Sequence, residues 1–303
     1  MTTNHEAHPK ADAEDVDEKQ GDKVGQALND ERFQMLADIA KELTGTVVFP
    51  TYFDAAFHLR QELHDPALPT ARIARIVSLE PLVATKLMRL ANSAYYRRRN
   101  NQVIDLKAAI TRLGIDVVRT TALAIAMGQL MRSKDLVAFN DFTHALWEHS
   151  IKTASATRIL AHTYTRINPD EALLAGLVHD LGAFYMLYRA VQYPELRARP
   201  DTLKHLILQW HESIGVTLLN ALGMPDEIVQ ATIDHDQPRA APAMVRTLSE
   251  IVYVGNILAG TDFEWLRQNF DPDVGESGLV RQNFADLLPE IEADAQEMLT
   301  LFT

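Results

Sequence analysis

The sequence places a histidine beside an aspartate inside an apolar run, "ALLAGLVHDLGAFYML" at residues 172–187. A buried ionised carboxylate without a partner costs several kcal/mol, so Asp180 must be paired, protonated or bound to a metal ion. Three interpretations of His179 and Asp180 are open. They hold a metal ion, they bond to polar neighbours, or they remain from a site that once held an ion.

Four more polar residues interrupt apolar stretches in the second half of the chain: His149 in "ALWEHS", His211 in "QWHESIG", His235 in "ATIDHD" and Asn256 in "YVGNILAG". Each stretch has helical periodicity, and we assign them to separate helices. Imidazoles and a carboxylate that converge from different helices would form a nitrogen and oxygen site suited to Fe, Mn or Zn. We therefore predict one divalent ion with these candidate ligands: His149, His179, Asp180, His211, His235 and Asn256. Asp180 is also the candidate catalytic residue.

The elements that must position these residues are predicted to be helices almost throughout. Asn168 is a favoured N-cap, and Pro169 follows it at the first helical position, where its missing N–H has no cost. Gly114 and Gly260 are expected to end two apolar helices. The longest segment that alternates with period two is the short "TVVF" at 46–49, so we predict an all-α fold without a parallel sheet.

The 303 residues are enough for two domains, or for one domain with an appendage. Residues 1–22 carry seven acidic side chains against two lysines and almost nothing apolar, which predicts a disordered acidic tail over residues 1–28. The tail is interpreted as a solubilising leader, with partner binding as the alternative. After it we expect two helical subdomains, at residues 29–135 and 136–303.

Composition excludes several classes of protein. The chain has no cysteine, so disulfides, thiolate metal sites and cysteine nucleophiles are excluded. No apolar stretch reaches the roughly 18 residues of a membrane span, and the N-terminus has no apolar signal region. A net charge of −12 is unfavourable for binding nucleic acid. We therefore expect a cytoplasmic protein that has neither nucleic acid nor a membrane as its partner.

Two groups of motifs carry a family resemblance. The first half contains "EPLVATKLMRLANSAYY" and "AAITRLG", and the second contains "LWEHSIKTA", "LLAGLVHDLG", "HESIGVTLL" and "ATIDHD". Residues 45–260 resemble the HDOD subgroup of the HD superfamily of metal-dependent phosphohydrolases. The resemblance implies that the second subdomain is an HD-like helical bundle.

The resemblance also implies roles for individual residues. His149, His179 and Asp180 match the leading HD ligands, and His211 and His235 match further histidines of the two-metal HD-GYP branch. Asn256 falls where active relatives usually place an aspartate. No Gly-Tyr-Pro motif follows His235, which argues against activity on cyclic di-GMP.

HDOD members generally look like non-catalytic proteins of signalling and regulation. We therefore expect a regulatory module that acts through contacts with a protein partner or a small ligand such as a nucleotide, with self-association as one form. The alternative is a metal-dependent phosphohydrolase or phosphodiesterase for a nucleotide or cyclic dinucleotide. Its phosphate would meet Arg97, Arg98, Arg99 or Arg119, although a solvated loop is the ordinary interpretation of "YYRRRNN". A plain helical scaffold with a relic His-Asp pair is a third interpretation.

Overall fold

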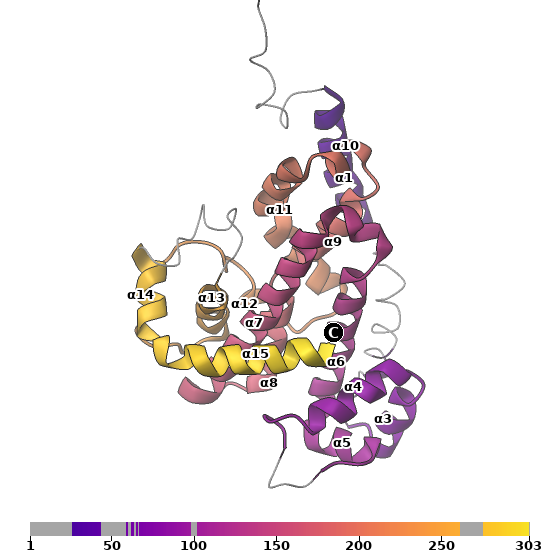
Figure 1. Ribbon diagram of the computed structural model, residues 1–303, viewed down its shortest axis with the longest axis vertical. Coiled ribbons are helices and arrows are strands. Elements are labelled where there is room, and N and C mark those ends of the chain that lie inside the picture. The colour runs from indigo at the N-terminus through magenta and orange to yellow at the C-terminus, as the bar shows by residue number, and fades with distance from the viewer. Residues whose placement is uncertain are drawn as a thin grey trace, which may run out of the picture.

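The computed structural model describes residues 26–43, 59, 62–63, 65, 67–97, 102–260 and 275–302. Within these residues every regular element is a helix and no strand is present, which confirms the predicted all-α fold. The elements, most of them labelled in Figure 1, are α1 (Gln26–Leu43), α3 (Thr70–Val77), α4 (Pro81–Ala91), α5 (Leu106–Leu113), α6 (Ile115–Met131), η1 (Lys134–Phe139), α7 (Asn140–Tyr164), α8 (Pro169–Val178), α9 (Leu181–Ala190), α10 (Pro194–Ala198), α11 (Pro200–Ala221), α12 (Asp226–Ala231), α13 (Leu248–Ala259), α14 (Gly275–Asn283), η3 (Ala285–Leu287) and α15 (Leu288–Phe302).

Some sequence predictions fall on parts of the chain outside this description. Residues 1–25 of the predicted acidic tail lie outside the described residues, as does "TVVF" at 46–49. The tail was predicted to reach residue 28, but residues 26–28 already belong to α1. The Leu28 side chain is only 1% exposed, because it packs into the core and so holds the first turn of this helix in place.

Local signals explain several helix ends. The Asn168 side chain accepts a hydrogen bond from the Asp170 backbone N–H, and Pro169 is the first residue of α8. Thr247 and Glu250 form a reciprocal capping box at the start of α13. Between α5 and α6 the chain turns at Gly114, whose φ of 84° is readily adopted by glycine alone. These ends follow from the sequence without reference to tertiary structure.

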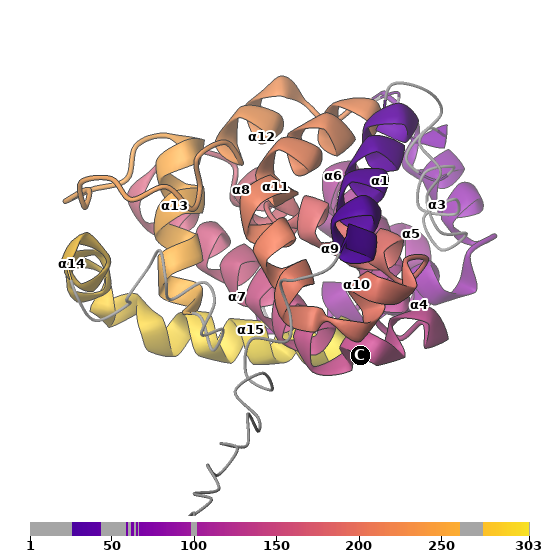
Figure 2. The ribbon, with the colours of Figure 1, turned by 90° about the horizontal axis from the view of Figure 1, so that it is seen from above.

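Helix α7 is the central element of the second half of the chain. Helices α8, α13 and α15 all pack against it (Figures 1 and 2). Its buried face includes His149, so α7 brings one polar side chain of the predicted cluster into the interior. One buried apolar core runs from Leu28 on α1 to Phe302 on α15, and therefore joins the two predicted subdomains.

Helices α9 and α11 cross very closely beside the His-Asp pair. At the crossing Gly182 lies against His211 and Gly215, and a Cβ added to Gly182 would stand 1.9 Å from the His211 carbonyl oxygen. Only glycine permits this approach. The close crossing matters for the site because it brings His211 next to the start of α9.

Helix α1 packs on the second half of the chain, beside α10 and α11 (Figure 2), although most of its residues belong to the predicted first subdomain. Glu42 forms an ion pair of 2.7 Å with Arg189 and accepts a hydrogen bond of 2.7 Å from Tyr185. Asp38 accepts a hydrogen bond of 2.6 Å from Tyr193. The subdomain boundary at 135/136 remains a prediction, but residues 29–43 contact α9, α10 and α11.

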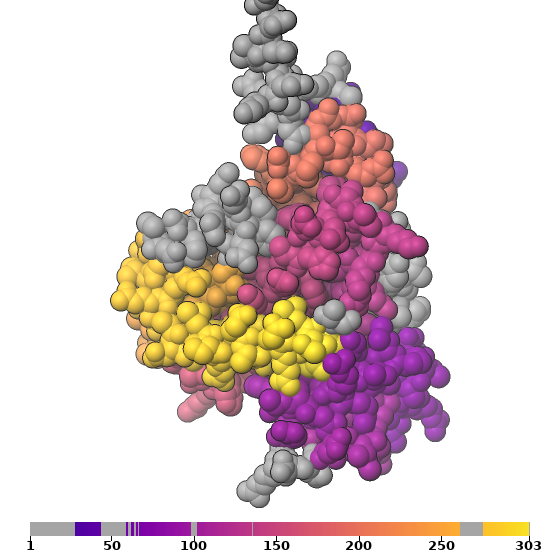
Figure 3. All heavy atoms as spheres, in the orientation of Figure 1, coloured from indigo at the N-terminus to yellow at the C-terminus, as the bar shows by residue number. Residues whose placement is uncertain are grey.

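Helix α15 links the two halves along the surface. Figure 3 shows its atoms, in yellow, running across this face until they meet those of the first half. The Arg89 guanidinium on α4 donates to the Thr300 carbonyl oxygen, and Arg132, just after α6, donates to that of Phe302. On α7, Arg158 forms an ion pair with Asp294 and is 1% exposed. The last helix therefore holds α4, α6 and α7 together.

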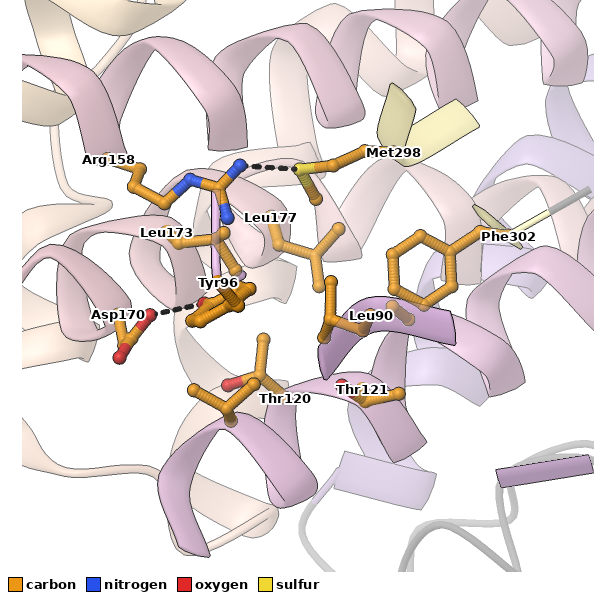
Figure 4. Close-up of a pocket in the computed structure, with 12 residues that line it drawn as sticks. Leu90, Tyr96, Thr120, Thr121, Arg158, Asp170, Leu173, Leu177, Met298 and Phe302 are labelled. Atoms are coloured by element: carbon orange, nitrogen blue, oxygen red, sulfur yellow. Dashed lines mark hydrogen bonds between the residues drawn. The ribbon is translucent and has the colours of Figure 1, made fainter. Parts of the chain in front are cut away.

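A small cavity of about 20 Å³, room for roughly one water molecule, lies at this junction. Figure 4 shows Arg158, Tyr96 and Asp170 on one side of it and apolar side chains on the other. Tyr96 donates a hydrogen bond of 2.5 Å to Asp170. The Arg158 guanidinium lies 4.0 Å from the centre of the Tyr95 ring, which stabilises its buried charge.

In the part of the chain that the structure describes, no single helix is long and apolar enough to cross a membrane. One bent pair, Leu106–Leu113 with Ile115–Met131, passes that test only when the two helices are taken together, and they meet at 104°.

Candidate metal centre

His179 and Asp180 lie in a break between two helices. The apolar run of the sequence continues through them, but α8 ends at Val178 and α9 begins at Leu181. The reason for the break is local, because the His179 side chain bonds back to the Gly176 carbonyl oxygen at 2.7 Å. Asp180 therefore occupies the N-cap position of α9 without capping it, and its carboxylate is directed to other partners.

The remaining predicted residues come from three helices and one turn. His149 belongs to α7, His211 to α11 and Asn256 to α13, as the sequence predicted. His235 was assigned to a helix, but α12 ends at Ala231 and His235 lies in the turn that follows. In that turn Asp234 adopts a φ of 56°, a conformation that aspartate tolerates better than most residues.

All of these polar side chains are buried. Their exposed fractions run from 1% at His235 to 5% at Asp180, His211 and Asn256. Asp236, which the sequence analysis did not single out, is 8% exposed and belongs to the same cluster. Because an imidazole or a carboxylate is costly to bury alone, the cluster must satisfy its own charges.

The four histidines share one arrangement. Each ring bonds through Nδ1 to a backbone carbonyl oxygen: His149 to Gly260 at 3.0 Å, His179 to Gly176 at 2.7 Å, His211 to Ile207 at 2.8 Å and His235 to Thr232 at 2.8 Å. A carbonyl oxygen only accepts, so each Nδ1 carries a proton and each ring directs its Nε2 atom into the cluster. Carbonyl groups that orient imidazoles in this way are a common feature of metal sites.

The first ion position, as we name it, is the space between His149, His179 and Asp180. The two Nε2 atoms are 3.2 Å apart, and Asp180 Oδ2 lies 3.3 Å from His179 Nε2 and 3.8 Å from His149 Nε2. Two Nε2 atoms at this distance need a proton or a metal cation between them, because two bare lone pairs would repel each other. These three residues form a group that could hold a metal ion.

The second ion position lies between His211, His235 and the other oxygen of Asp180. The Nε2 atoms are 3.4 Å apart, and Asp180 Oδ1 lies 3.5 Å from His211 Nε2 and 3.3 Å from His235 Nε2. This is the second group that could hold an ion. The Asp180 carboxylate is therefore shared, with one oxygen facing each position.

The donor distances fit ordinary coordination. Two donors that each lie about 2.1 Å from one ion, at an angle of about 90–110°, are about 3.0–3.4 Å apart. The pairs around both positions span 3.2–3.8 Å, so only small movements would bring them onto an ion. The imidazole and carboxylate donors suit Fe, Mn or Zn. The sequence predicted one ion, whereas the geometry provides two positions.

Two further residues complete the surroundings. Asp236 Oδ2 lies 3.2 Å from His211 Nε2, and its Oδ1 lies 3.7 Å from His235 Nε2. The predicted ligand Asn256 directs its amide nitrogen to Asp236 Oδ1 at 2.8 Å and to the His235 carbonyl oxygen at 3.3 Å. An amide N–H group is not a metal donor. The signal for Asp236 was present in the sequence, because "ATIDHD" contains a second His-Asp pair.

Charges within the cluster shift one another's pKa values. Burial alone would raise the pKa of Asp180, but the histidines around it hold that pKa well below its usual range. Burial lowers the pKa of His235, but Asp236 and Asp180 outweigh this effect and raise it to about 10. For His149, burial and the neighbouring His179 lower the pKa, so its ring is neutral near pH 7. The cluster thus carries protons that bound metal ions would replace.

The arginines predicted to meet a phosphate lie elsewhere or outside the description. The Arg119 guanidinium contacts Asp116 at 2.9 Å and the Leu63 carbonyl oxygen, so its contacts lead away from the cluster. Arg97 is exposed beyond the end of α4, and residues 98–99 fall outside the described residues.

Comparisons with known proteins agree with this architecture. A family profile described as the HDOD domain matches residues 49–238. A structure from Shewanella amazonensis, named provisionally as a metal-dependent phosphohydrolase, is similar with a TM-score of 0.63 and 22% identity over 88% of this chain and 99% of that one. An HDOD domain protein of unknown function from Geobacter sulfurreducens is similar with a TM-score of 0.55 and 17% identity over 89% and 98%.

A third structure, from Marinobacter aquaeolei and named provisionally as a signal transduction protein, has a TM-score of 0.52 and 19% identity over 90% of this chain and 66% of that one. At these identities the likeness concerns the fold. No curated protein matches the chain.

Proposed function

The chain belongs to the HDOD family, and from that premise we propose that it is a metal-binding signalling module that acts through contacts with a protein partner or a small ligand. The observation that carries the proposal is the Asp180 carboxylate, which faces two histidines with each of its oxygens. Six donor atoms from distant parts of the chain converge on two points, which is the arrangement that ion binding requires.

Bound ions would supply fixed positive charge between these donors, and such ions can also polarise a phosphoryl oxygen. The positions of the ligands in the chain determine which helices a bound ion would link. His149 lies on α7, Asp180 at the start of α9 and His211 on α11, so the site joins three elements. Helix α1 packs on α9 and α11, and its position therefore depends on the same crossing.

Burial favours a regulatory role over turnover. The four histidines and Asp180 are each at most 5% exposed, so little of the donors' surface is open to a substrate. An ion in such surroundings stabilises a conformation, as structural ions do. A partner that senses the surface around α1, α10 and α11 would then respond to ion binding.

The test is the ion content of the full chain. We expect close to two divalent ions per chain after supply of Mn, Fe or Zn, by elemental analysis. His149→Ala and His211→Ala should each reduce that content. His144→Ala and His205→Ala are matched controls, because these histidines lie exposed on the same two helices, α7 and α11. An unchanged chain that binds none of these ions above background would contradict the proposal.

The signalling role is tested separately by pull-down experiments in which the ion-loaded chain and the chelator-treated, metal-free chain serve as baits. A partner that is recovered with one form and not the other supports the module. A truncation that removes the acidic tail should end at residue 25, because residue 28 is part of the core. Equal recovery of the same partners by both forms would argue that the ions have no role in the contact.

A second candidate function is metal-dependent hydrolysis of a phosphoester, because a carboxylate shared between two ion positions is typical of two-metal hydrolases. Asn256, in place of the expected aspartate, and the absence of Gly-Tyr-Pro after His235 count against it. Turnover of nucleotides or cyclic dinucleotides by the Mn- or Fe-loaded chain, lost in Asp180→Asn, would favour this candidate.

A further inference from the structure

The donors around the two ion positions are not equivalent. The first ion position has two imidazoles and one oxygen of Asp180. The second has two imidazoles, the other oxygen of Asp180, and Asp236 within 3.2 Å of His211 Nε2 and 3.7 Å of His235 Nε2. Those separations fall in the same range as the other donor pairs of the cluster, so Asp236 lies close enough to bind the same ion.

We propose that Asp236 is a ligand of the second ion position, that this position binds its ion more tightly than the first, and that the first ion is the exchangeable one. The inference rests on the proposed function, since it presupposes that the cluster binds ions. A second carboxylate adds a full negative charge next to a divalent cation in a buried, weakly screened place. Four protein donors also resemble a closed structural site, whereas three donors leave a coordination position open.

Asn256 is the positioning residue for Asp236. Its amide nitrogen donates to Asp236 Oδ1 at 2.8 Å and to the His235 carbonyl oxygen at 3.3 Å, so it fixes both the carboxylate and the turn that carries it. Helix α13 is a firm support, because the capping box of Thr247 holds its start and the residues around Asn256 are buried. An amide suits this place because it donates.

A carboxylate at position 256 would face Asp236 at the same short distance and repel it. The resemblance to the HD superfamily led us to expect an aspartate at this position. In this chain the additional carboxylate stands at 236 instead, and the residue at 256 holds it in place. The carboxylate at 236 therefore offsets the one missing at 256, and the site keeps two carboxylates.

The experiment is a titration of the chelator-treated full chain with Mn²⁺, in which binding is measured by calorimetry and by electron paramagnetic resonance. The unchanged chain should show two binding events that differ at least about tenfold in affinity. Asp236→Asn should weaken the tighter event and leave the weaker one. Asp234→Asn is the matched control, because Asp234 is exposed in the same turn and asparagine also tolerates its backbone conformation.

Asn256 is tested with two variants whose folding is first checked by thermal unfolding. Asn256→Ala should weaken the tighter event by about 10- to 100-fold, the usual effect of removing a residue that orients a ligand. Asn256→Asp keeps the size of the side chain but loses the donor, and should weaken the same event. If Asn256 only filled space, Asn256→Asp would bind as the unchanged chain does, and that result would overturn the positioning role.

The outcomes separate the two proposals. If the unchanged chain binds no Mn²⁺, the proposed function and this inference both fail. If it binds two ions with equal affinity, or if Asp236→Asn leaves both events unchanged, the inference fails and the proposed function stands.

Discussion

Replacing Gly182 by alanine should separate the two helices that hold the second ion position. A Cβ at this residue would lie 1.9 Å from the His211 carbonyl oxygen and 2.6 Å from the Gly215 backbone nitrogen. Ordinary contact begins at 3.4 Å. Because the obstructing atoms belong to backbone and cannot rotate away, α9 and α11 must move apart by roughly 1.5 Å.

A movement of this size is large for metal coordination. Asp180 precedes α9 and His211 belongs to α11, and their donor atoms are 3.5 Å apart. Metal–ligand distances vary by only about 0.2 Å, so the second ion position should lose most of its affinity. The first position takes its histidines from α7 and the end of α8 and should change less. Overpacking of a core also lowers the free energy of unfolding by about 1–3 kcal/mol.

The assay combines urea unfolding with an Mn²⁺ titration of Gly182→Ala. Gly215→Ala is the matched control on the facing helix, since a Cβ there would lie 3.3 Å from the Gly182 nitrogen and needs only a small adjustment. We expect the control to keep both binding events and nearly all of its stability. A Gly182→Ala chain that binds two ions as the unchanged chain does would refute the argument that this crossing sets the site.

Three other predictions follow from single contacts. Asp294→Ala leaves the buried Arg158 charge without its carboxylate and should lower the free energy of unfolding in urea by about 3–5 kcal/mol. Asp201→Ala breaks an exposed ion pair on α11 and should lower it by less than about 1 kcal/mol. Equal losses of stability in the two variants would contradict this prediction. The His235 pKa of about 10 means that its ring is protonated near neutrality, so an ion must displace that proton and its affinity should rise about tenfold per pH unit between about pH 6 and pH 8. Calorimetry in buffers with different ionisation enthalpies measures the released proton, and affinity that is independent of pH would show that no proton is displaced. Asn168→Ala removes the N-cap of α8 and should lower the unfolding free energy by about 1 kcal/mol, while Asn168→Gly should lower it by a few tenths.

Helix ends marked by local chemistry were predictable from the sequence. The start of α8 at Pro169 and the turn at Gly114 follow from side-chain capping and backbone freedom, which act within a few residues. The break at His179 and Asp180 was not predictable in this way. Most residues of α8 and α9 are buried, so neither helix has a polar face. Without alternating polar and apolar faces, the sequence pattern does not show where one helix ends and the next begins.

The candidate site was predictable in part for a related reason. Polar residues in apolar stretches identified His149, His179, Asp180, His211 and His235, and the structure brings these five together. Asp236 was missed because the residues after it are polar and suggest a solvated turn, although it forms a second His-Asp pair with His235. The orientation of the Asn256 amide was also hidden, since it depends on a contact with a turn twenty residues earlier.

Contacts between distant segments were the least accessible to sequence analysis. Glu42 and Asp38 on α1 bond to α9 and to Tyr193, about 150 residues along the chain, and no local pattern links these segments. Such pairings depend on which surfaces meet, and local propensity does not encode that.

The most direct test of the account is anomalous X-ray diffraction from crystals of the full chain loaded with Mn²⁺. We expect two peaks on opposite sides of the Asp180 carboxylate, one beside His149 and His179 and the other beside His211 and His235. Data without anomalous density next to Asp180, from protein that was saturated with the ion, would contradict the claim that this cluster is a metal centre.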